Sequence, residues 1–94
     1  MFTSRGKINI RNAKYKYSNE PIDPLWGDDY DSQFSLGYLR HLFVANEILA
    51  LILATRQNIR FYLWLARTAR EKILSGEFRQ WKKDFLSGYL QKID

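Results

Sequence analysis

Residues 33–54, QFSLGYLRHLFVANEILALILA, decide how this chain folds. Phe34, Tyr38 and Leu42 recur at intervals of four and share one face of a helix. We expect this helix to run from about Gln33 to Ala54, with Asp31 or Ser32 as its N-terminal cap. Beyond Leu42 the stretch is apolar on most sides, which predicts burial on more than one side. A second copy of the chain or the rest of a larger domain would supply that cover.

Two further helices follow in the sequence. The second is expected from about Arg56 to Leu74, with Thr55 as its cap and Gly76 just beyond its end. The third is expected from Phe78 to Leu90. We therefore expect a mainly α fold of three helices.

The part before the helices is expected to be extended. Residues 7–12 alternate polar and apolar side chains, which predicts a half-buried strand after Gly6. Tyr15 and Tyr17 continue the alternation and suggest a second extended segment. Residues 19–31 hold both prolines and five acids and are predicted to be a loop. The expectation is one domain over 1–94: an extended N-terminal segment (1–18), an acidic loop (19–31) and a helical region (32–94), an α+β arrangement.

Composition limits the classes of protein that fit. The 94 residues are 46% hydrophobic and contain no cysteine, so a packed core is expected and a disulfide framework or thiolate metal site is excluded. The N-terminus has no apolar run typical of a signal peptide. Leu42 to Ala54 is shorter than the roughly 20 residues that span a bilayer. The expectation is a soluble, cytoplasmic protein with no membrane association.

The net charge of +5 is unevenly distributed. Five basic residues precede the first acid: Arg5, Lys7, Arg11, Lys14 and Lys16. On the second helix, Arg56, Arg60, Arg67 and Arg70 project within about 80° of one another at 100° per residue. A basic arm and an arginine stripe are typical of a polyanion binder such as RNA. A solvated surface, or a surface paired with acids on another chain, fits the same pattern.

Catalytic and cofactor motifs are missing. His41 is the only histidine, no serine lies in a nucleophile elbow, and the five glycines are too scattered for a phosphate loop. Asp28, Asp29 and Asp31 lack the ligand spacing of a calcium loop, so a solvated loop is the favoured interpretation. No cofactor is expected.

Several blocks of sequence, in order, carry a family resemblance. They are Gly6-x-Ile8-Asn9-Ile10-Arg11-Asn12-Ala13, Pro21-Ile22-Asp23-Pro24, Tyr38-Leu39-Arg40-His41-Leu42-Phe43, Glu47-Ile48-Leu49, Asn58-Ile59-Arg60-Phe61-Tyr62 and Ile73-Leu74-Ser75-Gly76-Glu77-Phe78. From about Phe2 to Tyr89 the chain resembles the C-terminal region of tRNA-guanine transglycosylases. The resemblance implies a family that exchanges a guanine at the anticodon wobble position of tRNA for queuine or its precursor. It also implies a (β/α)8 barrel with a zinc-binding insertion near the C-terminus.

Two departures from the family pattern matter. The family's catalytic aspartates lie upstream of the matched segment, so the isolated chain is expected not to catalyse base exchange. The zinc pattern Cys-x-Cys-x-x-Cys…His is occupied here by Trp26, Asp28, Asp31 and Gln57. These side chains cannot form a thiolate-rich tetrahedral site, so no metal is expected, and packing by Trp26 is expected to hold the loop instead.

The resemblance also implies partners. The family forms homodimers through aromatic residues on the helix after the metal loop, which Phe34, Tyr38, His41 and Leu42 match. Its C-terminal region contacts tRNA through basic side chains, which Arg11 and Lys14 match, whereas Arg60 is a less certain counterpart. The leading hypothesis is a truncated or separately encoded tRNA-contacting and dimerisation module that lacks the barrel portion. The alternative is a structural or interaction protein that reuses the domain, such as a basic subunit of a ribonucleoprotein assembly.

Overall fold

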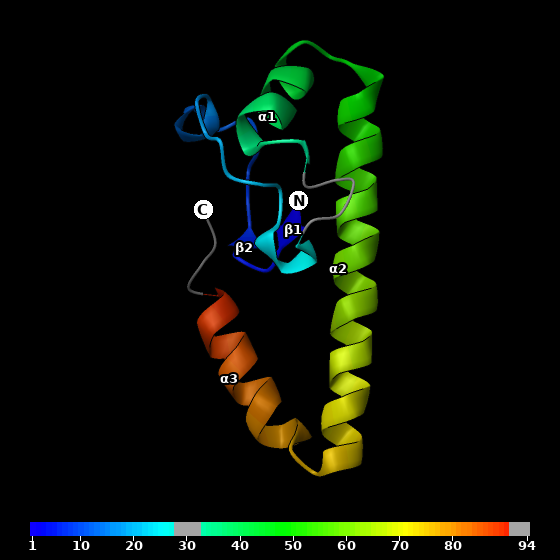
Figure 1. The fold of residues 1–94 in the computed structure, drawn as a ribbon. Helices are drawn as coiled ribbons and strands as arrows, with labels where there is room; N and C mark the ends of the chain where they lie inside the picture. The colour runs from blue at the N-terminus through cyan, green and yellow to red at the C-terminus, as the bar shows by residue number, and fades with distance from the viewer. Residues whose placement is uncertain (28–32, 91–94) are drawn as a thin grey trace.

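The computed structural model describes residues 1–27 and 33–90 and is built around one long helix (Figure 1). Helix α2 (Ile48–Ser75) follows the shorter α1 (Leu36–Val44), and α3 (Phe78–Leu90) comes last. Strands β1 (Phe2–Thr3) and β2 (Gly6–Lys7) form an antiparallel hairpin, and two 3-10 turns, η1 (Ala13–Tyr15) and η2 (Pro24–Trp26), connect it to α1. The prediction of a mainly α fold with a small β segment is confirmed.

Within 1–27 and 33–90, the elements that pack on helix α2 gather on one side of it. In Figure 1, α1, the hairpin and α3 all lie along the same side of α2. The core contains Ile8, Ile10, Ile22, Leu36, Leu39, Leu42, Ala50 and Leu53. A second, aromatic cluster joins the hairpin to α2 and α3, with Phe2 and Tyr89 at 6.2 and 5.7 Å from Phe61 between ring centroids. Among the described residues, no helix is both long and apolar enough to cross a membrane.

The prediction of a single helix over 33–54 is wrong. The first helix, α1, begins later, at Leu36, and the second, α2, continues well past Ala54. The segment forms parts of two helices because Asn46 adopts a left-handed conformation, with φ 58°, and turns the chain between them. The Asn46 N–H donates to Phe43 O, and the Glu47 N–H donates to Leu42 O, so these bonds satisfy carbonyls at the end of α1. Asparagine tolerates this conformation better than most residues, and an apolar run gives no other warning of a break.

The helix caps differ accordingly. Ser35 caps α1 by accepting a hydrogen bond from the Tyr38 N–H at 3.0 Å, so the helix starts later than predicted; Asp31 and Ser32 lie outside the described residues. Thr55 was expected to be a cap but lies inside α2, since the helix already begins at Ile48. The prediction of Gly76 just beyond the second helix is confirmed, with φ 78°.

The N-terminal segment is less extended than predicted. Burial alternates as expected, with Ile8 and Ile10 buried and their neighbours exposed, but the strand ends at Lys7. The extended segment expected around Tyr15 and Tyr17 is wrong, because residues 13–15 form η1. The Asn12 side chain caps this turn by accepting from the Lys14 N–H at 3.0 Å. Asparagine side chains favour such turns over strand pairing.

Candidate RNA and partner surfaces and the network that holds them

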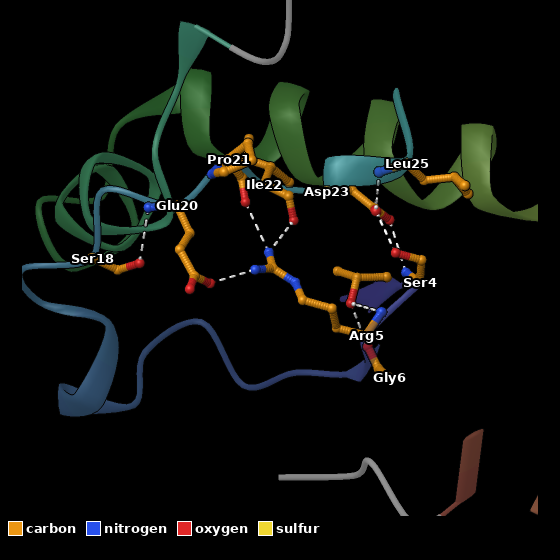
Figure 2. Close-up of polar contacts among 10 residues, drawn as sticks. Ser4, Arg5, Gly6, Ser18, Glu20, Pro21, Ile22, Asp23 and Leu25 are labelled. Atoms are coloured by element: carbon orange, nitrogen blue, oxygen red, sulfur yellow. Dashed lines mark hydrogen bonds and ion pairs between the residues drawn. The ribbon is translucent and has the colours of Figure 1, made fainter. Parts of the chain in front are cut away.

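A buried carboxylate anchors the N-terminal hairpin. Asp23 is 1% exposed, and its oxygens accept hydrogen bonds from the Ser4 N–H (2.8 Å) and hydroxyl (2.5 Å) and from the Leu25 N–H (3.0 Å). Figure 2 shows these bonds converging on Asp23. A buried charge is tolerated only when hydrogen bonds replace its lost hydration, and these donors, with the Gln57 amide, provide them.

Gln57 connects this carboxylate to α2. Its side chain is 2% exposed and uses both ends: Oε1 accepts from the Trp26 indole N–H at 2.7 Å, and Nε2 donates to Phe2 O and to Asp23 Oδ2, both at 3.0 Å. The next residue, Asn58, accepts from the Phe2 N–H at 2.9 Å. Two adjacent side chains of α2 therefore bind both backbone polar groups of Phe2 and fix the hairpin on the helix.

One of the five basic residues of the arm is used inside the fold. The Arg5 guanidinium pairs with Glu20 at 2.5 Å and donates to the carbonyls of Pro21 (2.8 Å) and Ile22 (2.9 Å), as Figure 2 shows. Arg5 therefore holds the loop before α1, and the Glu20 carboxylate partly neutralises its positive charge.

The other basic side chains of the arm lie at the surface beside aromatic rings. Arg11 is exposed, with its guanidinium 5.7 Å from the centroid of the Phe43 ring in α1. Its carbonyl accepts from the Arg40 side chain at 3.4 Å. Lys14 is exposed, with its ammonium 5.2 Å from the centroid of its neighbour Tyr15. The arm therefore presents cations next to flat rings on a backbone that is fixed against α1, an arrangement suited to phosphates and unstacked bases.

The predicted arginine stripe on α2 forms, but its members are in different environments. Arg56, Arg67 and Arg70 are exposed, whereas Arg60 is half-buried with its guanidinium 4.5 Å from the centroid of the Trp26 ring. Arg60 and Arg67 line a pocket of about 250 Å³ together with Trp26, Leu63 and Trp64.

The contacts of Arg11 are with α1 and not with this stripe, so the two basic groups are separate features. The tryptophans of the pocket were not predicted as part of a site. In the sequence, Trp26 was singled out only because the family resemblance aligns it with a zinc-ligand position.

The predicted dimer surface is partly in the core. Phe34 and Tyr38 stack with ring centroids 5.8 Å apart, Tyr38 is 44% exposed, and His41 is exposed. Leu42 is only 6% exposed and belongs to the core cluster, which also contains Ala50 and Leu53 of α2. Of the four predicted residues, Tyr38 and His41 are exposed, Phe34 is half-buried against the core, and Leu42 is buried in it.

Comparison with known proteins decides the family. A family model described as "Queuine tRNA-ribosyltransferase" matches residues 1–91. The chain belongs to this family. Curated members of the same name are similar: the Helicobacter pylori (strain ATCC 700392 / 26695) protein is 43% identical over 95% of this chain and 24% of its own length. The Thermosipho africanus protein is 42% identical over 93% of this chain and 24% of its own length. The chain thus spans about a quarter of the length of these queuine tRNA-ribosyltransferases.

Two of the four positions that the sequence resemblance aligns with zinc ligands can be tested for their fit to a metal. The Trp26 indole N–H is donated to Gln57, and the Gln57 oxygen accepts that bond while its amide nitrogen is bound to Phe2 and Asp23. Neither group offers a lone pair of the kind zinc binds, so these residues do not fit the ion. Asp28 and Asp31 lie outside the described residues. No cluster of three or more His, Cys, Asp or Glu suited to a metal occurs in 1–27 and 33–90.

Proposed function

We propose that this chain is the C-terminal tRNA-contacting and dimerisation module of a tRNA-guanine transglycosylase, serving queuosine modification of tRNA and not catalytic by itself. The observation that carries the proposal is the family match over residues 1–91, in a chain that covers about a quarter of its relatives. The barrel portion, meaning the part of the family's polypeptide outside that quarter, supplies the catalytic groups. The module acts in the cytoplasm and needs neither a cofactor nor zinc.

RNA contact is assigned first to the basic arm. Arg11 and Lys14 are exposed beside aromatic rings, and η1 and the Arg40 contact fix the backbone that carries them. Phosphate contacts of this kind position an RNA without reading its sequence. The arginine stripe, which consists of Arg56, Arg60, Arg67 and Arg70, forms a second contact region, where the Trp26 and Trp64 rings offer stacking surfaces.

The test is the salt dependence of tRNA binding by the 94-residue chain. Log affinity should fall linearly with log salt, and Arg11→Ala or Lys14→Ala should weaken binding and reduce the slope by about one each. Lys82→Ala is the matched control: it removes the same charge from an exposed position on α3 and should have little effect. Affinity indifferent to salt would remove RNA contact from the proposal.

Dimerisation is assigned to the surface formed by Phe34, Tyr38 and His41. Tyr38, which is 44% exposed, and the exposed His41 present this surface, while the half-buried Phe34 ring stacks on Tyr38 and Leu42 lies in the core. Aromatic side chains of this kind often carry the binding energy of an interface.

Sedimentation checks this assignment. Tyr38→Ala should convert a dimer to a monomer, whereas Tyr17→Ala, at a tyrosine that is 84% exposed outside this surface, should not. A chain that stays monomeric at high concentration would exclude self-association through this surface.

A further inference from the structure

The basic arm ends in two tyrosines that the fold treats differently. In the stretch Lys14-Tyr15-Lys16-Tyr17, the Tyr15 side chain packs against the core. The Tyr17 side chain is 84% exposed, the highest value among the large hydrophobic residues of 1–27 and 33–90. A single exposed apolar residue is common on protein surfaces, so exposure alone assigns Tyr17 no role. The backbone beneath this ring and the charges around it do.

The backbone that carries Tyr17 is fixed against the start of α1. The Ser18 N–H donates to the Tyr15 carbonyl at 3.0 Å, and the Ser18 carbonyl accepts from the Gly37 N–H at 3.1 Å. Gly37 allows this close approach, because a Cβ there would lie 2.7 Å from the Ser18 carbonyl oxygen and 3.1 Å from that of Lys16. The Tyr17 ring is therefore presented to solvent from an ordered turn, and a partner that binds it need not order the backbone.

The charge beside the ring is positive. Lys16 is exposed, and its ammonium lies 5.3 Å from the centroid of the Tyr17 ring. The sequence has no acid before Glu20, and the Glu20 carboxylate pairs with Arg5. A flat, exposed ring beside a cation suits an unpaired nucleotide, whose base stacks on the ring while its phosphate meets the cation. Bases inside a duplex are covered on both faces by their neighbours, so they cannot stack on Tyr17 in this way.

We propose that Tyr17 and Lys16 form a contact for one unpaired nucleotide of RNA, with the base stacked on the Tyr17 ring and the phosphate held by the Lys16 ammonium. This contact rests on the proposed function, in which the basic arm binds tRNA, and it narrows that role. The phosphate contacts of Arg11 and Lys14 are indifferent to base pairing, whereas the Tyr17 contact requires a base that is free to stack. The arm thus selects a single-stranded part of the RNA over a helical stem.

The stacking contact is tested with one RNA in two forms. The probes are a labelled single-stranded RNA of roughly 12 nucleotides and the same strand annealed to its complement, and binding to the chain is followed by fluorescence anisotropy. Tyr17→Ala and Tyr17→Leu should weaken binding of the single strand about fivefold or more and change duplex binding less than about twofold. Tyr17→Phe keeps the ring and should bind both forms as the wild type does. Equal losses on the two forms, or full single-strand affinity for Tyr17→Ala, would overturn the proposal.

Salt dependence separates the ring from the cation. Lys16→Ala should reduce the slope of log affinity against log salt by about one, whereas Tyr17→Ala should lower affinity and leave the slope unchanged. Lys83→Ala is the matched control, since Lys83 is also exposed but lies on α3, and it should alter neither. An unchanged slope for Lys16→Ala would remove the phosphate from the proposed contact.

Failure of this contact can be told apart from failure of the proposed function. If Tyr17→Ala keeps full single-strand affinity while Arg11→Ala weakens tRNA binding, the stacking contact is refuted and RNA binding by the arm stands. If wild-type affinity for every RNA is indifferent to salt, both are refuted. A dimer that Tyr17→Ala dissociates in sedimentation would place the ring between two copies of the chain and overturn the proposal. Because Tyr17 is exposed, its variants should keep the wild-type midpoint of urea unfolding, so a loss of binding reports on the contact itself.

Discussion

Gln57→Ala is the substitution that tests most directly how the N-terminal arm is held. The buried amide makes three hydrogen bonds, to the Trp26 indole, the Phe2 carbonyl and the Asp23 carboxylate. Truncation to alanine removes all three bonds. The indole N–H, the Phe2 carbonyl and the Asp23 carboxylate then each lose one hydrogen bond at a buried position. The bond to the charged Asp23 is the strongest of the three.

The size of the effect follows from these bonds. The bond to a carboxylate is worth about 1.5–3 kcal/mol and each neutral bond about 1 kcal/mol, so the free energy of unfolding should fall by about 3–5 kcal/mol. A domain of this length has a total stability at the low end of about 5–15 kcal/mol. At about 4–8 °C per kcal/mol, the midpoint of thermal unfolding should drop by more than about 12 °C.

Urea unfolding followed by ellipticity at 222 nm measures the loss, and Gln80→Ala provides the control. Gln80 is exposed and its amide makes one hydrogen bond, to Asp84 at 2.9 Å, so the same change there should cost less than about 1 kcal/mol. If the two alanine variants unfold within about 1 kcal/mol of each other, the network does not anchor the arm and the reasoning fails.

Three further predictions concern other parts of the chain. Gly37→Ala should destabilise by about 1–3 kcal/mol in urea unfolding, because a Cβ there would lie 2.7 Å from the Ser18 carbonyl oxygen; Gly88→Ala, with nothing within 4 Å, should be neutral or stabilising. Burial raises the pKa of Tyr89 above its ordinary 10.0, so its neutral form stabilises the fold below pH 10 and this contribution is lost as pH rises through the raised value. Unfolding measured from pH 9 upward should show that loss, and Tyr89→Phe should reduce it. Excess EDTA should leave the midpoint of thermal unfolding unchanged, and metal analysis should find no stoichiometric zinc; a drop with EDTA would contradict the metal-free network.

The mainly α fold could be predicted from sequence because its signals are local. Helical spacing and Gly76 lie within a few residues of the structure they determine, so the helical class and the end of α2 at Gly76 were predicted correctly. The break at Asn46 could not be predicted, because α1 and α2 are both apolar and a single left-handed residue separates them. The short β hairpin was also missed, since the two residues of β1 give too little pattern to recognise.

The contacts of the site depend on residues far apart in sequence. Gln57 binds Phe2, which is 55 residues away in the sequence, and Asp23, which is 34 residues away, and no periodicity in the sequence predicts either contact. For the same reason the sequence could not separate Arg5, which is bound by Glu20 and two carbonyls, from Arg11, which is exposed. Charge patterning identified the basic arm as a whole, but only the folded loop determines which cations remain available.

The anchoring network and the proposed RNA surface are physically coupled through Trp26. The Trp26 indole N–H donates to Gln57 Oε1 at 2.7 Å, and the Arg60 guanidinium lies over the same ring. Trp26, Arg60 and Arg67 all line one pocket. Without the Gln57 bond, the indole loses the contact that fixes its orientation, and Arg60 loses a preorganised position. Gln57→Ala should therefore weaken tRNA binding even under conditions where the chain stays folded, although Gln57 itself is buried and cannot touch RNA. Full tRNA affinity in a folded Gln57→Ala chain would show that the stripe on α2 is not part of the contact, and would leave the arm at Arg11 and Lys14 as the RNA surface.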